Sequence, residues 1–220
     1  VKVLVPERDW RNSVGDHFPS KRSSVFFTSL NRAIDDCSAR LLLPSIEREI
    51  RRRVTDQAVE HAIHVFSKNL HALLIQPPIV DHVILAIDPG FRTGSKIAVL
   101  APTGSVLETG TIYPHPPQNR VDESRQILNI LIQKHQVSLI VIGNGTGSRE
   151  TERFIADITS KSQGLNYLIT SEAGASVYSA SKDARAEFPD LDVSLRGAIS
   201  IGRRVLDPLA ELVKIDPKAI

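Results

Sequence analysis

The apolar residues of this chain change their spacing abruptly at residue 82. Before that point, an apolar stripe from Ile46 to Leu70 recurs about once per helical turn. After Pro77-Pro78, which reads as a stiff linker, residues 82–87 form an unbroken apolar run. Such a run is typical of a strand that is buried on both faces. The change therefore predicts a mainly helical segment over residues 1–80 and a separate sheet-containing domain over residues 81–220.

Short apolar runs alternate with helical patterns throughout the second domain. We expect strands over residues 82–87, 96–100, 106–113, 137–142 and 166–170, and helices over residues 122–135, 149–161, 176–187 and 195–213. A three-strand meander followed by alternating helices and strands favours an α/β fold, a mixed five-stranded sheet with helices on both faces. At the other end of the chain, alternating Val1, Val3 and Val5 predict the end of a strand, and Gly15 and Pro19 predict a loop behind it.

The composition narrows the class of protein. Of the 220 residues, 41 % are apolar and 24 % are charged, which is ordinary for a globular protein. The formal net charge of +2 permits nucleic-acid binding without requiring it, because a local basic patch matters more than the total. No apolar run approaches the roughly 18–20 residues of a membrane span, so we expect no membrane partner. The lone Cys37 cannot form an internal disulfide, and with no recognisable signal peptide we expect a cytoplasmic protein.

The first candidate site follows the first predicted strand. Asp88 stands at the start of a turn that also contains Arg92 and Thr93. An Asp at the carboxyl end of a central strand can hold a divalent cation, and glycines in the turn let backbone N–H groups approach an anion closely. The alternative is a hairpin turn in which Asp88 caps local N–H groups. The residues alone leave both interpretations open.

A glycine-rich loop over residues 143–148 forms the second candidate site. It contains Asn144, Thr146 and Ser148, and Arg149 follows at the start of a predicted helix. Such a loop puts N–H groups and a helix N-terminus in front of a phosphate, although neither a P-loop nor a dinucleotide motif is present. The alternative is a plain capping loop in which Thr146 or Ser148 is the N-cap.

Glu172 is the third candidate. It follows the last predicted strand, so we expect it at the same sheet edge as Asp88 and Asn144. Ligands of open sheets collect at the carboxyl ends of the strands, which favours a functional role for this carboxylate. The alternative is a solvated side chain at the end of a strand.

Three arginines make the last predicted helix basic. Arg196, Arg203 and Arg204 could contact a phosphate, or they could form ordinary surface ion pairs. We expect Ser194 to be the N-cap of this helix. In the helical segment, His61 and His64 have the spacing of two metal ligands, but without a third ligand in view a packing or solvent role is favoured.

Longer stretches of the chain resemble bacterial Tex-type transcription accessory proteins. The resemblance covers about four fifths of the chain in the same order, from about Leu41 to Ile220. The matching stretches are residues 43–49, 58–70, 74–78, 87–94, 112–115, 142–146, 148–151, 171–181, 188–198 and 207–215. The resemblance implies a longer protein with a larger helical domain, helix-hairpin-helix elements and an RNA-binding OB-fold outside this chain. The start at Val1 and the lack of methionine likewise indicate a fragment.

The resemblance further implies a YqgF-type domain with an RNase H-like fold, similar to the RuvC-like resolvases. Those enzymes hold two Mg²⁺ ions with a cluster of at least three acids. Asp88 matches the acid of the first strand, and Glu172 matches the acid after the fifth strand. The third acid falls near residues 197–200, where this chain has no carboxylate, and Asn144 stands where the resolvases place another acid.

These observations rank three functions. The first is a nucleic-acid-binding module, for RNA or DNA, that works with the transcription machinery and has lost independent catalysis. The second is a nuclease that uses Mg²⁺ or Mn²⁺ at Asp88 and Glu172, with a third ligand from Asp183, Asp190 or Asp192. The third is an actin-like ATPase, suggested by the turn after the first strand but without an adenosine-binding motif.

Overall fold

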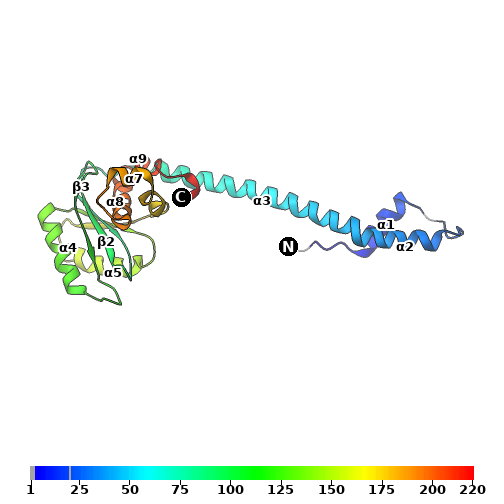
Figure 1. The fold of residues 1–220 in the computed structure, drawn as a ribbon, viewed down its shortest axis with the longest axis horizontal. Helices are drawn as coiled ribbons and strands as arrows, with labels where there is room; N and C mark the ends of the chain where they lie inside the picture. Colours follow the sequence, from blue (N-terminus) through cyan, green and yellow to red (C-terminus); the bar gives the residue numbers. More distant parts are fainter. Residues whose placement is uncertain (1–2, 20) are drawn as a thin grey trace. The chain divides into compact units, whose positions relative to one another are not determined.

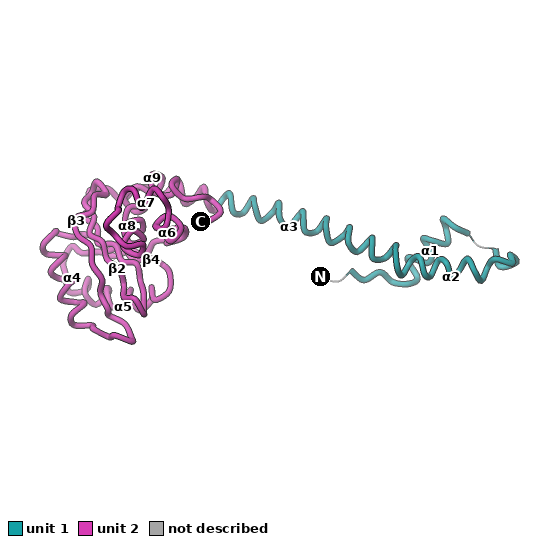
Figure 2. Tube along the Cα trace, viewed as in Figure 1, with its two compact units in different colours: residues 1–68 teal, residues 69–220 magenta. Residues whose placement is uncertain are grey.

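The computed structural model describes residues 3–19 and 21–220 (Figure 1). The chain divides into two compact units, residues 1–68 and residues 69–220 (Figure 2). Within the described residues, the first unit consists of α1 (Glu7–His17), α2 (Phe27–Cys37), a π-helical turn (Ser38–Leu42) and most of α3 (Leu43–Leu74). The predicted helical stripe thus lies on one long helix.

Helix α1 corrects the loop that was predicted for these residues. Glu7 and Asp9 in its first turn and His17 in its last turn favour the helix dipole. Gly15 lies inside the helix, where a glycine costs about 1 kcal/mol relative to alanine and therefore does not have to end it. Arg11 pairs with Asp35 and so ties α1 to α2. Of the predicted N-terminal strand, Val1 lies outside the described residues, and residues 3–6 form neither strand nor helix.

The second unit is built on a five-stranded sheet in the order β3-β2-β1-β4-β5. The strands are β1 (Ile84–Asp88), β2 (Ser95–Leu100), β3 (Val106–Ile112), β4 (Leu139–Gly143) and β5 (Asn166–Thr170). The first three form an antiparallel meander, whereas β4 pairs parallel to β1 and β5 pairs parallel to β4. This mixed sheet confirms the expected RNase H-like architecture.

Helices cover both faces of the sheet (Figure 1). On one face, α4 (Val121–His135) and α5 (Ser148–Thr159) pack over a core that includes Leu85 and Ile87. On the other face, α8 (Val193–Leu206) packs over a core that includes Ile84 and Ala86. Successive residues of β1 point to opposite faces, and both faces are covered, so the apolar run of this strand is buried throughout.

A glycine allows α8 to lie close to the sheet. A Cβ atom at Gly202 would stand 2.5 Å from Leu100 Cδ1 and 2.8 Å from Ala86 Cβ, which is closer than packed carbon atoms approach. Because Gly202 has only a hydrogen atom in place of a side chain, α8 can pack closely against strands β1 and β2.

The last two predicted helices are each interrupted. The helix predicted over residues 176–187 is α6 (Ala175–Ser179) followed by α7 (Lys182–Glu187), because Ser181 caps a new helix by accepting a hydrogen bond from the Ala184 N–H. The helix predicted over residues 195–213 is α8 followed by α9 (Pro208–Leu212). Pro208 cannot donate a hydrogen bond within α8, and Asp207 caps α9.

Asp192 caps α8 instead of the predicted Ser194. Its Oδ1 accepts a hydrogen bond of 2.8 Å from the Leu195 N–H, and the helix begins at Val193. A carboxylate at this position also interacts favourably with the positive end of the helix dipole. A short 3₁₀-helix (Pro217–Ala219) ends the chain.

Candidate functional site

Three parallel strands bring the predicted site residues to one edge of the sheet. β1 ends at Asp88, β4 ends at Gly143 and β5 ends at Thr170, so the loops that follow them leave the same edge. Asn144 joins two of these loops, because its Oδ1 accepts a 3.1 Å hydrogen bond from the Glu172 N–H. The register of the parallel strands therefore places Asp88, Asn144 and Glu172 at the same edge, as expected.

Two glycines, one at the end of β4 and one in the loop after it, make room for the Glu172 carboxylate. A Cβ atom at Gly145 would lie 1.7 Å from Glu172 Oε1, and one at Gly143 would lie 2.7 Å from Glu172 Oε2. Glu172 Oε2 is shielded from solvent and has no hydrogen-bond partner. The carboxylate therefore lies over the loop backbone instead of extending into water as a free strand-end side chain would.

Asp88 and Glu172 interact electrostatically. The pKa of Asp88 is raised to about 6, first by burial and then by the negative charge of Glu172, while Lys96 partly opposes both effects. The Lys96 Nζ donates a 2.7 Å hydrogen bond to the Thr93 carbonyl, so it lies beside the turn and forms no ion pair with Asp88. The site thus holds a partly buried Asp88 whose charged form is disfavoured by the nearby Glu172 carboxylate.

The position opposite Asp88 carries no third acid. A Cβ atom at Gly197 on α8 would stand 3.0 Å from Asp88 Oδ2, so a side chain at this position would lie against the Asp88 carboxylate. Gly197 is one of the residues near which a third acid was expected from the resemblance. The donor set at this edge is therefore two carboxylates, which does not match the three or more that a pair of divalent ions requires.

The alternative third ligands do not complete the set. Asp183, Asp190 and Asp192 are exposed, and Asp192 is used as the cap of α8. Across residues 3–19 and 21–220, no three or more His, Cys, Asp or Glu side chains are grouped so that they could hold a metal ion. The suggestion that one of these aspartates joins Asp88 and Glu172 is wrong for the described residues: Asp183 lies on α7, and Asp190 and Asp192 lie in the segment between α7 and α8.

The residues of the β1–β2 turn, the β4–α5 loop and the start of α5 that were predicted to contact phosphate differ in exposure. Arg92, Thr93, Asn144, Thr146 and Arg149 are exposed. Ser148 is half-buried at the start of α5, and Gly147, with φ of 88°, occupies the N-cap position that was predicted for Thr146 or Ser148.

The exposed arginines near this edge form no ion pairs within the described residues. In the described part of the chain, Arg92, Arg149 and Arg153 form no ion pair, whereas Arg125 and Lys161 both pair with Asp157. Arg153 is one turn beyond Arg149 on α5 and was missed from the sequence. The helical spacing of four residues from Arg149 was the available signal.

A buried polar cluster supports the loops of the site, and sequence analysis did not find it. The Phe91 ring lies against Gly147, with its Cζ 3.3 Å from where a Cβ atom would stand, and packs edge-on against His115 at 5.8 Å between ring centroids. His115 Nε2 is hydrogen-bonded to the buried Thr151 Oγ1 at 3.0 Å. Burial lowers the pKa of His115, and Glu150 opposes that effect. The cluster joins the β1–β2 turn to the start of α5.

The arginines of α8 are occupied inside the fold. Arg196 and Arg204 are buried, and they donate hydrogen bonds to the carbonyls of Phe188 and Ser171 respectively. Arg203 donates to the Gly104 carbonyl and pairs with Glu187 at 2.6 Å. None of these guanidinium groups is therefore available on the surface for a phosphate contact.

A match to a family model shows which protein family the chain belongs to. The model for the "Tex protein YqgF-like domain" matches residues 82–206, which include the whole sheet and α8. The chain belongs to the Tex YqgF-like family.

Curated relatives of this Tex YqgF-like chain are much longer than it is. Protein tex of Bordetella pertussis is 50% identical over 181 residues, which cover 81% of this chain and 23% of that protein. The transcriptional accessory protein Tex of Neisseria gonorrhoeae is 49% identical over 178 residues, which cover 80% of this chain and 23% of that protein. The chain thus spans about a quarter of the length of these relatives.

A solved structure of Thermus thermophilus RuvC in complex with a Holliday junction substrate is a structural neighbour of part of this chain. It is 12% identical, its TM-score is 0.38, and the alignment covers 56% of this chain and 90% of that one.

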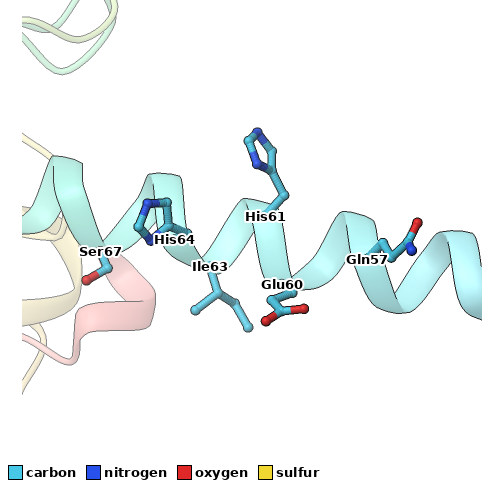
Figure 3. A pocket seen from close by; sticks show the side chains of 6 residues that line it. All are labelled: Gln57, Glu60, His61, Ile63, His64 and Ser67. Carbon is cyan, nitrogen blue, oxygen red and sulfur yellow. The ribbon is translucent and has the colours of Figure 1, made fainter.

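The two histidines with metal-ligand spacing lie outside the Tex YqgF-like domain. His61, His64 and Glu60 line a hollow on α3 together with Gln57, Ile63 and Ser67 (Figure 3). The side chains all come from one helix, and the rings of His61 and His64 point in different directions (Figure 3).

No helix among the described residues is both long and apolar enough to cross a membrane.

Proposed function

We propose that the Tex YqgF-like domain of this chain binds nucleic acid without cleaving it, as part of a cytoplasmic transcription accessory protein. The observation that carries the proposal is Gly197, whose missing side chain leaves Asp88 and Glu172 without a third carboxylate. Two-metal cleavage of a phosphodiester needs a ligand set that neutralises both ions and fixes them in line with the scissile bond. Two acids that repel each other do not supply it.

Nucleic-acid binding is supported by the unpaired cations around the same edge. Arg92 and Arg149 lie on the turn after β1 and at the start of α5, and both are exposed. Phosphate contacts from such cations release counterions and supply most of the sequence-independent affinity for nucleic acid. Because no intramolecular carboxylate holds them, these arginines can turn toward a phosphate at little cost. We add Arg153, Thr93, Asn144 and Thr146 to the proposed interface.

Salt-dependent binding tests the interface. Fluorescence anisotropy of labelled single-stranded RNA, single-stranded DNA and duplex DNA would be measured over a range of salt concentrations. For the Arg92→Ala/Arg149→Ala double variant we expect weaker binding, and a slope of log K against log salt that is shallower by about 2, or about 1 for each lost phosphate contact.

The matched control for binding is Lys161→Ala. It removes one positive charge at the other end of α5, where Lys161 is paired with Asp157 at 2.7 Å. We expect this variant to bind as the unaltered chain does. If the double variant and Lys161→Ala had the same affinity and salt slope, the proposed interface would be wrong.

Cleavage assays test the second half of the proposal. RNA, DNA and branched junctions would be incubated with the chain in the presence of Mg²⁺ or Mn²⁺, and we expect no turnover above a heat-treated sample. Metal-dependent cleavage that disappears in Asp88→Ala would establish the nuclease alternative and overturn the proposal.

A further inference from the structure

Arg204 is a buried cation that is only partly hydrogen-bonded. It is 5% exposed, and its Nη1 donates to the carbonyl oxygens of Ser171 at 2.6 Å and Ala173 at 3.0 Å. Its Nε and Nη2 atoms have no hydrogen-bond partner and are shielded from solvent. Within the described residues, no carboxylate lies close enough to form an ion pair with it.

An unpaired buried guanidinium is unfavourable, which calls for an anionic partner. Leaving a buried charge without compensation costs several kcal/mol, and hydrogen-bond donors left unmade add to the cost. Burial lowers the pKa of Arg204 more than the charges of Glu211 and Glu172 raise it, so these two acids compensate the guanidinium incompletely. The fold therefore keeps a buried cation that forms no direct ion pair with the acids near it.

Arg204 also lines a cavity of about 280 Å³ beside β5. The polar groups at this cavity are Gln76, Thr170 and Ser171, and its apolar wall includes Leu168 and Val205. Glu211, the acid that acts most on Arg204, borders a different cavity; its Oε2 is held by Lys214 at 2.8 Å, and its buried Oε1 has no hydrogen-bond partner. The cation and the acid thus face separate spaces.

We infer that this cavity binds a carboxylate attached to a small apolar group. Nε and Nη2 form one edge of the planar guanidinium, and that edge matches the two oxygen atoms of a carboxylate in a bidentate pair. One cation with two acids in its neighbourhood suits a single negative charge better than the double charge of a phosphate. A ligand reaches the edge only if side chains at the cavity wall shift. This site is separate from the proposed nucleic-acid interface and does not depend on it.

NMR titration of the chain with propionate tests the site, with the Arg204 Nε–Hε resonance as the probe. We expect a saturable shift of that resonance in the unaltered chain. Arg204→Lys keeps the charge but removes the paired donors, so it should weaken propionate binding, observed on the backbone N–H groups of Thr170 and Ser171, by about tenfold or more.

Arg203→Lys is the matched control, because Arg203 is the neighbouring arginine and pairs with Glu187 instead. We expect it to bind propionate as the unaltered chain does. If Arg204→Lys does not fold, the titration of the unaltered chain decides alone. The proposal is overturned if propionate leaves the Arg204 resonance unmoved, or if inorganic phosphate binds there as tightly as propionate. A high-resolution structure with the Nε–Nη2 edge bound to Glu211, directly or through water, would overturn it as well.

Discussion

Gly197 on α8 faces Asp88 at the end of β1, and a Cβ atom on this glycine would lie 3.0 Å from Asp88 Oδ2. The two residues are more than a hundred positions apart, and the packing of α8 across the sheet brings them together. This contact leaves the carboxylates of Asp88 and Glu172 without a third acid at one position, and it identifies the substitution that would supply one.

We expect Gly197→Asp to create a divalent-cation site. The added carboxylate would repel Asp88 and Glu172, so the variant should unfold at a lower temperature than the unaltered chain when EDTA is present. Mn²⁺ should restore stability, because an ion at a hundred times its Kd stabilises the folded state by about 2.7 kcal/mol. Differential scanning calorimetry with EDTA and with Mn²⁺ measures both effects.

Gly197→Asn is the control for this experiment, since it adds a side chain of the same shape without the charge. It should lose stability through crowding, and Mn²⁺ should not restore that loss. An equal gain from Mn²⁺ in the unaltered chain would show that two carboxylates already hold the ion, contrary to our interpretation.

Asp88 should destabilise the fold above its raised pKa. An acid whose pKa rises from 3.8 to about 6 on folding is protonated in both states at low pH and ionised in both at neutral pH. Its contribution to stability is therefore lost as the pH rises from about 4 to about 6. Asp88→Asn should be more stable than the unaltered chain at neutral pH, by about 3 kcal/mol at 1.36 kcal/mol per pKa unit.

Urea unfolding at a series of pH values measures this gain, and the Asp88 carboxyl ¹³C shift gives the titration midpoint directly. Asp183→Asn, at an exposed acid on α7, is the control and should give no comparable gain. If the extra stability of Asp88→Asn did not change with pH, it could not be caused by loss of the Asp88 charge.

Gly202→Ala should destabilise the second unit. The added methyl group would overlap Leu100 and Ala86, and crowding of this kind in a core typically costs about 1–3 kcal/mol. Ser200→Ala, on the same buried helix, removes a hydroxyl that has no hydrogen-bond partner, so it should be neutral or slightly stabilising. The denaturation midpoint should therefore fall clearly in Gly202→Ala, and it should stay the same or rise slightly in Ser200→Ala.

His115 and Thr151 should behave as a coupled pair. His115→Phe keeps a ring beside Phe91 but leaves the buried Thr151 hydroxyl unpaired, at a cost of about 1–3 kcal/mol. Adding Thr151→Val removes the orphaned hydroxyl and should recover part of that loss. A double-mutant cycle from urea unfolding measures the coupling, and strict additivity of the two changes would exclude the hydrogen bond as its source.

The free energy of unfolding of the unaltered chain should also depend on pH through His115. Burial lowers the pKa of His115, so its contribution to stability is present above the ordinary histidine pKa and is lost as the pH falls below it. His115→Phe should lack this loss. The difference between the two proteins in unfolding free energy should therefore narrow on acidification.

The sheet and the position of its carboxylates could be predicted because they follow from local pattern. An apolar run bounded by turn residues predicts a buried strand, and residues directly after parallel strands must share one edge, which places Asp88, Asn144 and Glu172 together. Helix breaks were less predictable. The interruptions before Lys182 and Pro208 depend on single capping hydrogen bonds by Ser181 and Asp207, which the apolar pattern does not record.

The sequence by itself determined the mixed sheet, the two carboxylates at its edge and the absence of an acid near residue 197, because strand periodicity and residue identity are local properties. Only the tertiary structure decided which side chains are available for binding. In the sequence, the arginines of α8 looked as available for binding as Arg92 and Arg149. Packing buried Arg196 and Arg204 among backbone carbonyls, whereas Arg92 and Arg149 are exposed to water. Burial depends on contacts between residues far apart in the chain, and a helical pattern cannot specify those contacts.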